Sequence, residues 1–240
     1  MPDPKQIYYG GDYNPDQWPE NIWQEDVRLF RLAGVNLVTL PVFSWAKLQP
    51  DEDHYDFTWL DRILDLLHEN GIAVCLATPT AAQPAWMSRR YPDILPVDEQ
   101  GRKRTHGKRV NICPNSPSFR RFSREIARRM ADRYSRHPAL AMWHVANEYG
   151  TYCYCENCEA AFRTWLRNRY KTVDELNDRW NTAFWGHTIY EWDEIVVPSE
   201  RNDDNKWYQP IMLDYLRFMT DANIACFNNE ADVLRAATPE

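Results

Sequence analysis

The sequence LAMWHVANEYGTYCYCENC, residues 140–158, joins an apolar run to an Asn-Glu pair and then to a tight cluster of cysteines. The apolar run predicts a buried strand over residues 140–146. Glu148 follows this strand directly, and a carboxylic acid at the end of a buried strand is a common place for catalysis. The spacing of Cys153, Cys155 and Cys158 is typical of a metal site. The stretch therefore predicts a strand that brings polar chemistry to one edge of a sheet.

The rest of the chain alternates between strand patterns and helix patterns. The predicted strands cover residues 7–11, 35–40, 72–77 and 140–146. The predicted helices cover residues 19–33, 57–67, 116–130, 159–170, a short segment opened by Thr172 and Glu175, and residues 209–235. For the last of these, a continuous helix and a broken one both fit the pattern. A long polar connection, residues 79–116, separates the third strand from the third helix, and loops of this length are usually functional or disordered.

Alternating strands and helices indicate an α/β fold with parallel strands and right-handed crossovers. Two architectures fit, a doubly wound open sheet and a (β/α)8 TIM barrel. A barrel usually needs about 250 residues for its eight strands, whereas only four strands are recognisable here. We therefore expect an incomplete barrel, about the first half or slightly more. Residues 1–240 would be the N-terminal part of that barrel domain.

The composition narrows the class of protein. With 240 residues and 44% hydrophobic residues, the chain can form a sizeable core. The net charge of -7 argues against nucleic acid or an anionic membrane as the main partner. The N-terminal residues lack a signal-peptide pattern, and the apolar runs are too short to span a bilayer. We therefore expect a cytoplasmic protein whose six cysteines are thiols or metal ligands rather than disulfides.

Four of the cysteines form a candidate metal site. Cys153, Cys155 and Cys158 lie close together in the sequence, and Cys113 lies at the end of the long connection. Four thiolates around zinc form a closed tetrahedral site with no position for water. We therefore expect a structural zinc that fastens the long connection to residues 153–158. The alternative is a coincidental group of buried thiols, which is also how we interpret Cys75 and Cys226.

Glu148 is the candidate catalytic carboxyl. We expect it to enter the mouth of the barrel with Trp143 and Tyr149 nearby. An apolar surrounding disfavours the charged form of a carboxyl, as a general acid near neutral pH requires. Asn147 can donate a hydrogen bond to a sugar hydroxyl beside the reacting carbon. The alternative is a surface glutamate that caps the next helix.

Several further motifs, taken together with these, resemble one enzyme family. They are YYGGDYNPDQWP (residues 8–19), VFSWAKLQP (42–50), YDFTWLD (55–61), Arg109 four residues before Cys113, HVANEYG (144–150) and NTAFWGH (181–187). With the cysteine pattern, they resemble glycoside hydrolase family 42, which are β-galactosidases with a (β/α)8 catalytic barrel. The resemblance extends over essentially the whole chain.

The resemblance implies a retaining mechanism with two glutamates and assigns roles to residues of this sequence. Glu148 matches the acid/base, while Arg109 and Asn147 match residues that bind the galactosyl group. Trp185 matches an aromatic residue of the sugar pocket. Cys113, Cys153, Cys155 and Cys158 match the zinc cluster of many members. The family also implies a β-galactoside substrate, a homotrimer, and a nucleophilic glutamate on a later strand that this sequence does not include.

Other aromatic and basic residues have simpler interpretations. Trp23, Trp59 and Trp165 occupy the inner faces of predicted helices and should belong to the core. Trp45 is a pocket candidate besides Trp185. The arginines of the third helix (Arg120, Arg121, Arg124, Arg128 and Arg129) lie opposite its apolar stripe, so we interpret them as a solvated outer face rather than a nucleic-acid patch.

Three hypotheses follow. The first is a retaining β-galactosidase, in which Glu148 is the acid/base and the nucleophile lies outside this chain. The second is a non-catalytic fragment of such a barrel that binds a sugar or a partner. The third is a metal-dependent hydrolase that uses the cysteine site.

Overall fold

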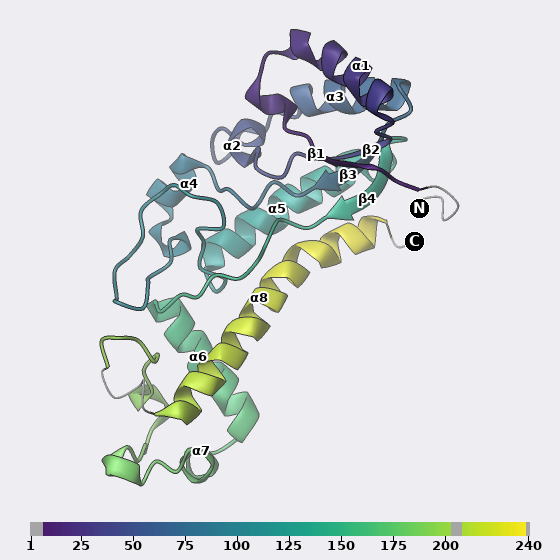
Figure 1. The fold of residues 1–240 in the computed structure, drawn as a ribbon. Helices are drawn as coiled ribbons and strands as arrows, with labels where there is room; N and C mark the ends of the chain where they lie inside the picture. The colour runs from purple at the N-terminus through teal and green to yellow at the C-terminus, as the bar shows by residue number, and fades with distance from the viewer. Residues whose placement is uncertain (1–6, 203–207, 239–240) are drawn as a thin grey trace.

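The computed structural model describes residues 7–202 and 208–238. Its centre is a sheet of four parallel strands that lie side by side in chain order (Figure 1). The strands are β1 (Gly10–Asp12), β2 (Leu37–Leu40), β3 (Ala73–Ala77) and β4 (Leu140–His144). All four predicted strands are present, each shorter than the run that predicted it.

The order of the strands decides between the two predicted architectures. A doubly wound sheet reverses its strand order at a switch point, where the crossovers change direction. Within the described residues the order is β1-β2-β3-β4 without a reversal, and every pair is parallel. A continuous order of this kind is that of a (β/α)8 barrel. The prediction of an incomplete TIM barrel is therefore confirmed as a fold class.

Helices connect and follow these strands. The three long connecting helices are α1 (Trp23–Ala33), α3 (Thr58–Glu69) and α5 (Pro117–Tyr134). Two short helices that we did not predict are α2 (Trp45–Leu48) and α4 (Ala85–Arg90). The helices after β4 are α6 (Glu156–Tyr170), α7 (Val173–Trp180) and α8 (Gln209–Ala237). Single 3-10 turns cover Pro15–Gln17, Glu20–Ile22, Pro92–Ile94, Phe184–Gly186 and Trp192–Glu194.

The main core forms because each connecting helix has one apolar face. In α3, Leu60, Ile63, Leu64 and Leu67 recur at helical spacing, and all four are buried in the main cluster. Burying each such side chain contributes about 1.5–3 kcal/mol. Trp23 and Trp59 belong to the same cluster, as predicted.

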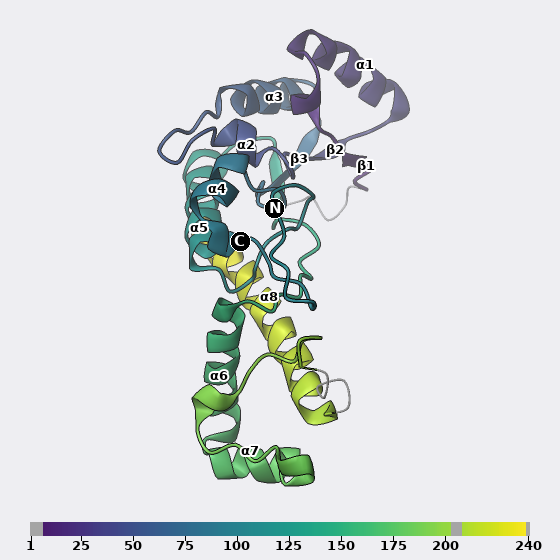
Figure 2. The same cartoon turned by 90° about the vertical axis from the view of Figure 1, so that its left-hand side faces the viewer.

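A second hydrophobic cluster lies apart from the sheet. It joins α6, α7 and the N-terminal half of α8, which extend as an arm from the sheet in both views (Figures 1 and 2). Phe162, Leu166 and Tyr215 are fully buried there, and Trp165 packs against them. Cys113, Cys153 and Cys158 also belong to this cluster. The cysteine site therefore lies at the base of the arm.

Helix α8 returns from the arm to the sheet. It is continuous over 29 residues, so the alternative with a break is wrong. Its C-terminal half packs along α5 (Figure 1). Among the residues that the structure describes, neither α8 nor any other helix is long and apolar enough to cross a membrane.

Contacts with α8 change the interpretation of the arginines on α5. Arg120 donates to the backbone carbonyl of Ala222 at 3.2 Å, and Arg124 donates to that of Asn229 at 3.2 Å. These two arginines therefore join α5 to α8 instead of facing only solvent. Arg128, by contrast, forms a surface ion pair with Glu125 on its own helix.

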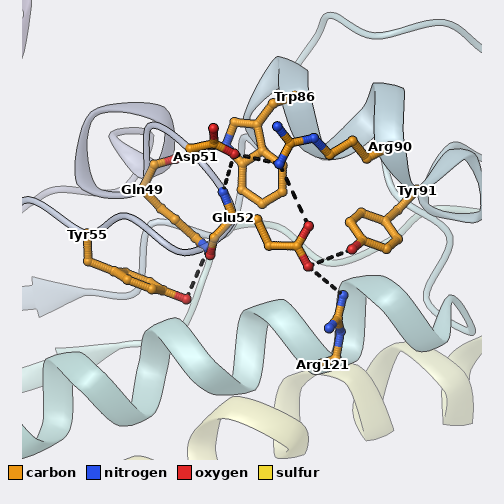
Figure 3. Close-up of polar contacts among 8 residues, drawn as sticks. All are labelled: Gln49, Asp51, Glu52, Tyr55, Trp86, Arg90, Tyr91 and Arg121. Atoms are coloured by element: carbon orange, nitrogen blue, oxygen red, sulfur yellow. Dashed lines mark hydrogen bonds and ion pairs between the residues drawn. The ribbon is translucent and has the colours of Figure 1, made fainter.

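A buried glutamine holds the connection after β2 in place (Figure 3). Gln49 is fully buried, and its side-chain oxygen accepts a 2.8 Å hydrogen bond from the indole of Trp45. Its amide nitrogen donates to Tyr55, and its backbone carbonyl accepts from Trp86 on α4. Trp45 is itself completely buried. Its prediction as a pocket residue is therefore wrong, because its ring fills the core and its N–H is used internally.

The predicted N-cap of α5 leads to a stability test. Ser116 accepts a 3.0 Å hydrogen bond from the Phe119 amide and donates to Asp93 at 2.6 Å. Ser116→Ala removes both bonds, so we expect a loss of about 1–2 kcal/mol in the free energy of unfolding. Ser118→Ala on the same turn is the control, with an expected change within about 0.5 kcal/mol. Urea unfolding of the complete protein measures both, and equal effects would contradict this role of Ser116.

Candidate active site and metal centre

Glu148 lies at the carboxyl end of β4, in a turn of unusual backbone conformation. β4 ends at His144, and the chain then passes through Ala146 (φ 51°) and Glu148 (φ 47°). Both values lie in the left-handed region, which residues with a Cβ rarely adopt. Such conformations persist where surrounding contacts hold them, and they are frequent at active sites.

The long connection delivers Arg109 to the same place. Lys108 (φ 62°) and Val110 (φ 52°) flank it in left-handed conformations, and the Val110 amide donates to Ala81 O at 2.7 Å. Nη1 of Arg109 lies 2.7 Å from Oε2 of Glu148. The structure therefore brings together two residues that we predicted from separate motifs.

These residues line a cleft at the carboxyl ends of the strands. Its volume is about 430 Å³, and segments 104–110 and 148–152 form its walls. Arg104, Lys108 and Arg109 make one wall positively charged, and Glu148 is the one carboxylate among the lining residues. A second hollow, of about 420 Å³, lies between Glu148 and α8. The glutamate therefore lies between two spaces that a ligand can enter.

The surroundings of Glu148 differ from the prediction. Its side chain is 65% exposed, and that of Arg109 is 49% exposed. Trp143 is directed elsewhere, because its indole donates to Thr238, and the Tyr149 hydroxyl donates to Glu230. Among the described residues the carboxylate is therefore not enclosed by these two rings, although Tyr149 lines the second hollow beside it. The alternative role as a helix cap is also wrong, because α6 begins at Glu156 with Cys155 as its N-cap residue.

The other two predicted sugar-binding residues are placed differently. Asn147 lies beside Glu148 and is half-buried, and among residues 7–202 and 208–238 it has no hydrogen-bond partner. Its amide is therefore open to a ligand, although it does not line the 430 Å³ cleft. Trp185 is 69% exposed and stacks on Phe184, with 4.7 Å between the ring centres. The turn that carries it, Phe184–Gly186, follows α7 at the end of the arm far from β4 (Figures 1 and 2), so the described residues do not bring this turn to Glu148.

The four predicted metal ligands do converge. The sulfur atoms of Cys113, Cys153, Cys155 and Cys158 all lie within 4.8 Å of one another. Cys113 Sγ is 3.6 Å from Cys155 Sγ and 3.4 Å from Cys158 Sγ. Tetrahedral zinc with bonds of about 2.3 Å requires ligand sulfurs about 3.8 Å apart, so the four sulfurs fit one metal ion. All six cysteines are free, as predicted, and Cys75 and Cys226 are buried apart from this group.

Hydrogen bonds among the four cysteines change the pKa values of their thiols. Hydrogen bonds with Cys113, Cys153 and Cys158 hold the pKa of Cys155 well below its usual range. Hydrogen bonds with Cys153 and then Cys155 raise the pKa of Cys113. A divalent cation bound by these four sulfurs would replace their protons and favour the thiolate form.

The cysteine group also fastens the loop that carries Arg109. The Val97 amide donates to Cys153 Sγ at 3.4 Å, and the Tyr154 amide donates to Val97 O at 2.9 Å. Closer to the cleft, Thr151 Oγ1 donates to Val110 O at 3.0 Å. These contacts join the long connection to the segment after Glu148 at several points.

One buried residue near the site was missed. Glu230 on α8 is fully buried, and both of its carboxylate oxygens accept from Thr80 Oγ1 at 2.9 Å. A signal was present in the sequence, because Ala222, Cys226 and Glu230 recur at a spacing of four on the buried face of α8. A carboxyl on an apolar helical stripe is costly to bury without polar partners. Its presence in the sequence therefore indicates that polar side chains from another element meet α8 at this point.

A parallel sheet of this order, with a paired arginine and glutamate at the carboxyl ends of its strands, is typical of α/β-barrel enzymes. The protein-family model described as "Beta-galactosidase", Glyco_hydro_42, matches residues 12–240. The chain therefore belongs to glycoside hydrolase family 42, the β-galactosidases.

Individual relatives agree with this family. The chain is 56% identical over 238 residues to β-galactosidase BgaP of Planococcus sp. (strain L4), covering 97% of this chain and 35% of BgaP. It is 50% identical to β-galactosidase LacZ of Heyndrickxia coagulans, covering 98% of this chain and 36% of that protein. The crystal structure of β-galactosidase from Bacillus circulans sp. alkalophilus superposes with a TM-score of 0.94 at 52% identity, covering 98% of this chain and 35% of the other. The chain thus spans about a third of the length of the relatives it matches.

Proposed function

We propose that the complete protein is a retaining β-galactosidase, which hydrolyses terminal non-reducing β-D-galactose residues. The observation that carries this proposal is the 2.7 Å contact between Arg109 and Glu148 at the carboxyl end of the sheet. It occurs in a chain of glycoside hydrolase family 42. Residues 1–240 are then the N-terminal part of the catalytic barrel.

Glu148 serves as the acid/base in this proposal. It protonates the glycosidic oxygen as the sugar leaves and then deprotonates the water that hydrolyses the galactosyl-enzyme. Arg109 donates to one oxygen of this carboxyl. If a bound sugar accepted that hydrogen bond instead, the carboxyl oxygen would become free to carry a proton. The nucleophile is a second carboxyl, about 5–5.5 Å away. Neither hollow beside Glu148 has another carboxylate among its described lining residues, which supports a nucleophile from another part of the protein.

Arg109 and Asn147 bind the galactosyl group in this proposal. Half of the Arg109 side chain is exposed, and the Asn147 amide is open to a ligand, so both can donate to sugar hydroxyls. The proposed role of Trp185 in sugar binding concerns the complete protein, because this chain places that ring away from Glu148.

The proposed metal is one structural zinc ion held by Cys113, Cys153, Cys155 and Cys158. Four thiolates suit zinc, and a site with four protein ligands leaves no position for substrate or water. The metal would therefore stabilise the loop of Arg109 and the base of the arm rather than take part in catalysis. A metal-dependent hydrolase at the cysteine site is correspondingly disfavoured, since three of the four thiols are completely buried.

The complete protein is proposed to be a cytoplasmic homotrimer. Six free cysteines suit a reducing compartment. The trimer is what the family resemblance implies.

The second candidate function is a non-catalytic fragment that binds a sugar or a partner, and comparing two lengths of protein separates the two. We expect the complete protein to hydrolyse an aryl β-galactoside, and residues 1–240 alone to show no turnover, because the nucleophile in this proposal lies on another part of the protein. Released phenol measures both. Turnover by the 240-residue chain would contradict the account of the nucleophile, and an inactive complete protein would favour the binding fragment.

A further inference from the structure

Glu230 is a buried carboxyl that the proposed reaction does not use. It lies on the inner face of α8 and is 0% exposed. Burial raises its pKa to about 7, because the charged form loses its hydration. A buried carboxyl is costly unless nearby groups bond to it, so its partners indicate why the structure contains one.

The partners of Glu230 come from the carboxyl ends of two strands. After β3, Thr80 Oγ1 donates to both of its carboxylate oxygens at 2.9 Å. After β4, the Tyr149 hydroxyl donates to Oε1 at 2.5 Å. Thr78 Oγ1 lies 3.5 Å from Thr80 Oγ1 and accepts a 2.7 Å hydrogen bond from the Ala146 amide. One connected set of hydrogen bonds therefore runs from α8 through the end of β3 to the turn after β4.

This set of bonds ends on both sides of the Asn147–Glu148 pair. Ala146 immediately precedes the pair, and Tyr149 immediately follows it. Ala146 and Glu148 have φ values of 51° and 47°, a conformation that is unfavourable for residues with a Cβ. Among the described residues, Glu148 itself has one ion-pair partner, Arg109, and its side chain is mostly exposed. The anchors that hold the turn are therefore its neighbours, and Glu230 binds one directly and the other through two threonines.

We propose that Glu230 is a positioning residue, which fixes the Asn147–Glu148 turn at the end of β4 through Tyr149 on one side and through Thr80, Thr78 and Ala146 on the other. The inference rests on the proposed function, because positioning has a catalytic effect only if Glu148 is the acid/base. Proton transfer requires heavy atoms about 2.6–3.2 Å apart, so a small displacement of the turn suffices to impair it. Glu230 itself contacts neither hollow beside Glu148.

The test uses Glu230→Gln and Tyr149→Phe in the complete protein. Glu230→Gln removes the charge and one acceptor at nearly constant shape, while Tyr149→Phe removes a single hydrogen bond. Each variant is assayed on two β-galactosides, one with an acidic phenol and one with an alcohol as leaving group. The alcohol needs protonation by Glu148 far more than the phenol does. We therefore expect kcat/KM to fall by about 10- to 100-fold on the alcohol substrate and by less than about 5-fold on the phenol substrate.

Asp214→Asn is the matched control. Asp214 is also a buried carboxyl on α8 with a tyrosine donor, Tyr170, but it lies in the arm. This variant should lower the melting temperature and leave the ratio of the two kcat/KM values unchanged. Equal losses in kcat/KM on both substrates in the Glu230 and Tyr149 variants would overturn the proposal. Wild-type kcat/KM values on both substrates would overturn it as well. If Glu230→Gln does not fold, Tyr149→Phe decides alone. A complete wild-type protein without activity on either substrate would instead contradict the proposed function.

Discussion

Glu148→Gln in the complete protein is expected to lower kcat/KM by about 10²–10⁴-fold on a β-galactoside whose leaving group is an alcohol. The amide cannot donate a proton to the departing oxygen, and it cannot remove one from water afterwards. On a substrate with an acidic phenol, bond cleavage needs little protonation. The intermediate should then accumulate, which gives a burst of phenol followed by slow turnover.

Adding azide provides a second measurement on the same variant. Azide is a small anion that attacks the galactosyl-enzyme without a general base, so it should restore turnover of the phenol substrate and form galactosyl azide. Glu69→Gln is the control, since Glu69 is an exposed glutamate at the end of α3, and it should keep wild-type values. Full activity of Glu148→Gln on the alcohol substrate would remove Glu148 from the reaction.

Loss of the proposed zinc ion is expected to have the largest effect on stability. Structural zinc contributes about 10–16 kcal/mol to folding in small zinc-finger peptides. Here the arm also has an apolar cluster that includes Phe162 and Tyr215, so we expect a smaller loss of several kcal/mol. Cys113→Ser should leave less than one equivalent of zinc, lower the melting temperature, and increase hydrogen exchange in residues 92–113 and 151–158. These segments meet at the cysteine site, so they should loosen together.

Metal content and thermal unfolding before and after chelation measure this effect. Cys226→Ser is the control, because Cys226 is a buried thiol outside the cluster, and it should retain one equivalent of zinc. A full equivalent of zinc in Cys113→Ser, or a melting temperature that chelation does not change, would contradict a four-cysteine site. A rapid loss of kcat on chelation, before any unfolding, would favour the metal-dependent hydrolase instead.

The sequence predicted best those features that depend on residues close together in the chain. Gly34 ends α1 in a left-handed conformation (φ 73°), and Ser116 caps α5, both as the local pattern indicated. The cysteines were also recognisable, because three of the four lie within one short segment. The pocket role predicted for Trp45 was wrong, because its ring is completely buried in the core and its indole donates to Gln49.

Contacts between distant segments were harder to predict. Arg124 and Asn229 are 105 residues apart, yet they join α5 to α8. Glu230 and Thr80 are 150 residues apart, and no local pattern pairs them. The exposure of Glu148 was likewise not evident, because it depends on where Trp143 and Tyr149 find their hydrogen bonds.

The sequence by itself determined the alternation of strands and helices, the four cysteines proposed as metal ligands and the position of Glu148 after a buried strand. These features depend on apolar periodicity, capping and spacing, which act over a few residues. Only the tertiary structure decided the strand order, the contact between Arg109 and Glu148, and the burial of Glu230. Those features depend on which segments pack together, and packing is set by the whole chain because side-chain partners come from distant elements. The stretch 140–158 thus carries Glu148 and three of the four clustered cysteines, while the loop of Arg109 and helix α8 supply the contacts that surround them.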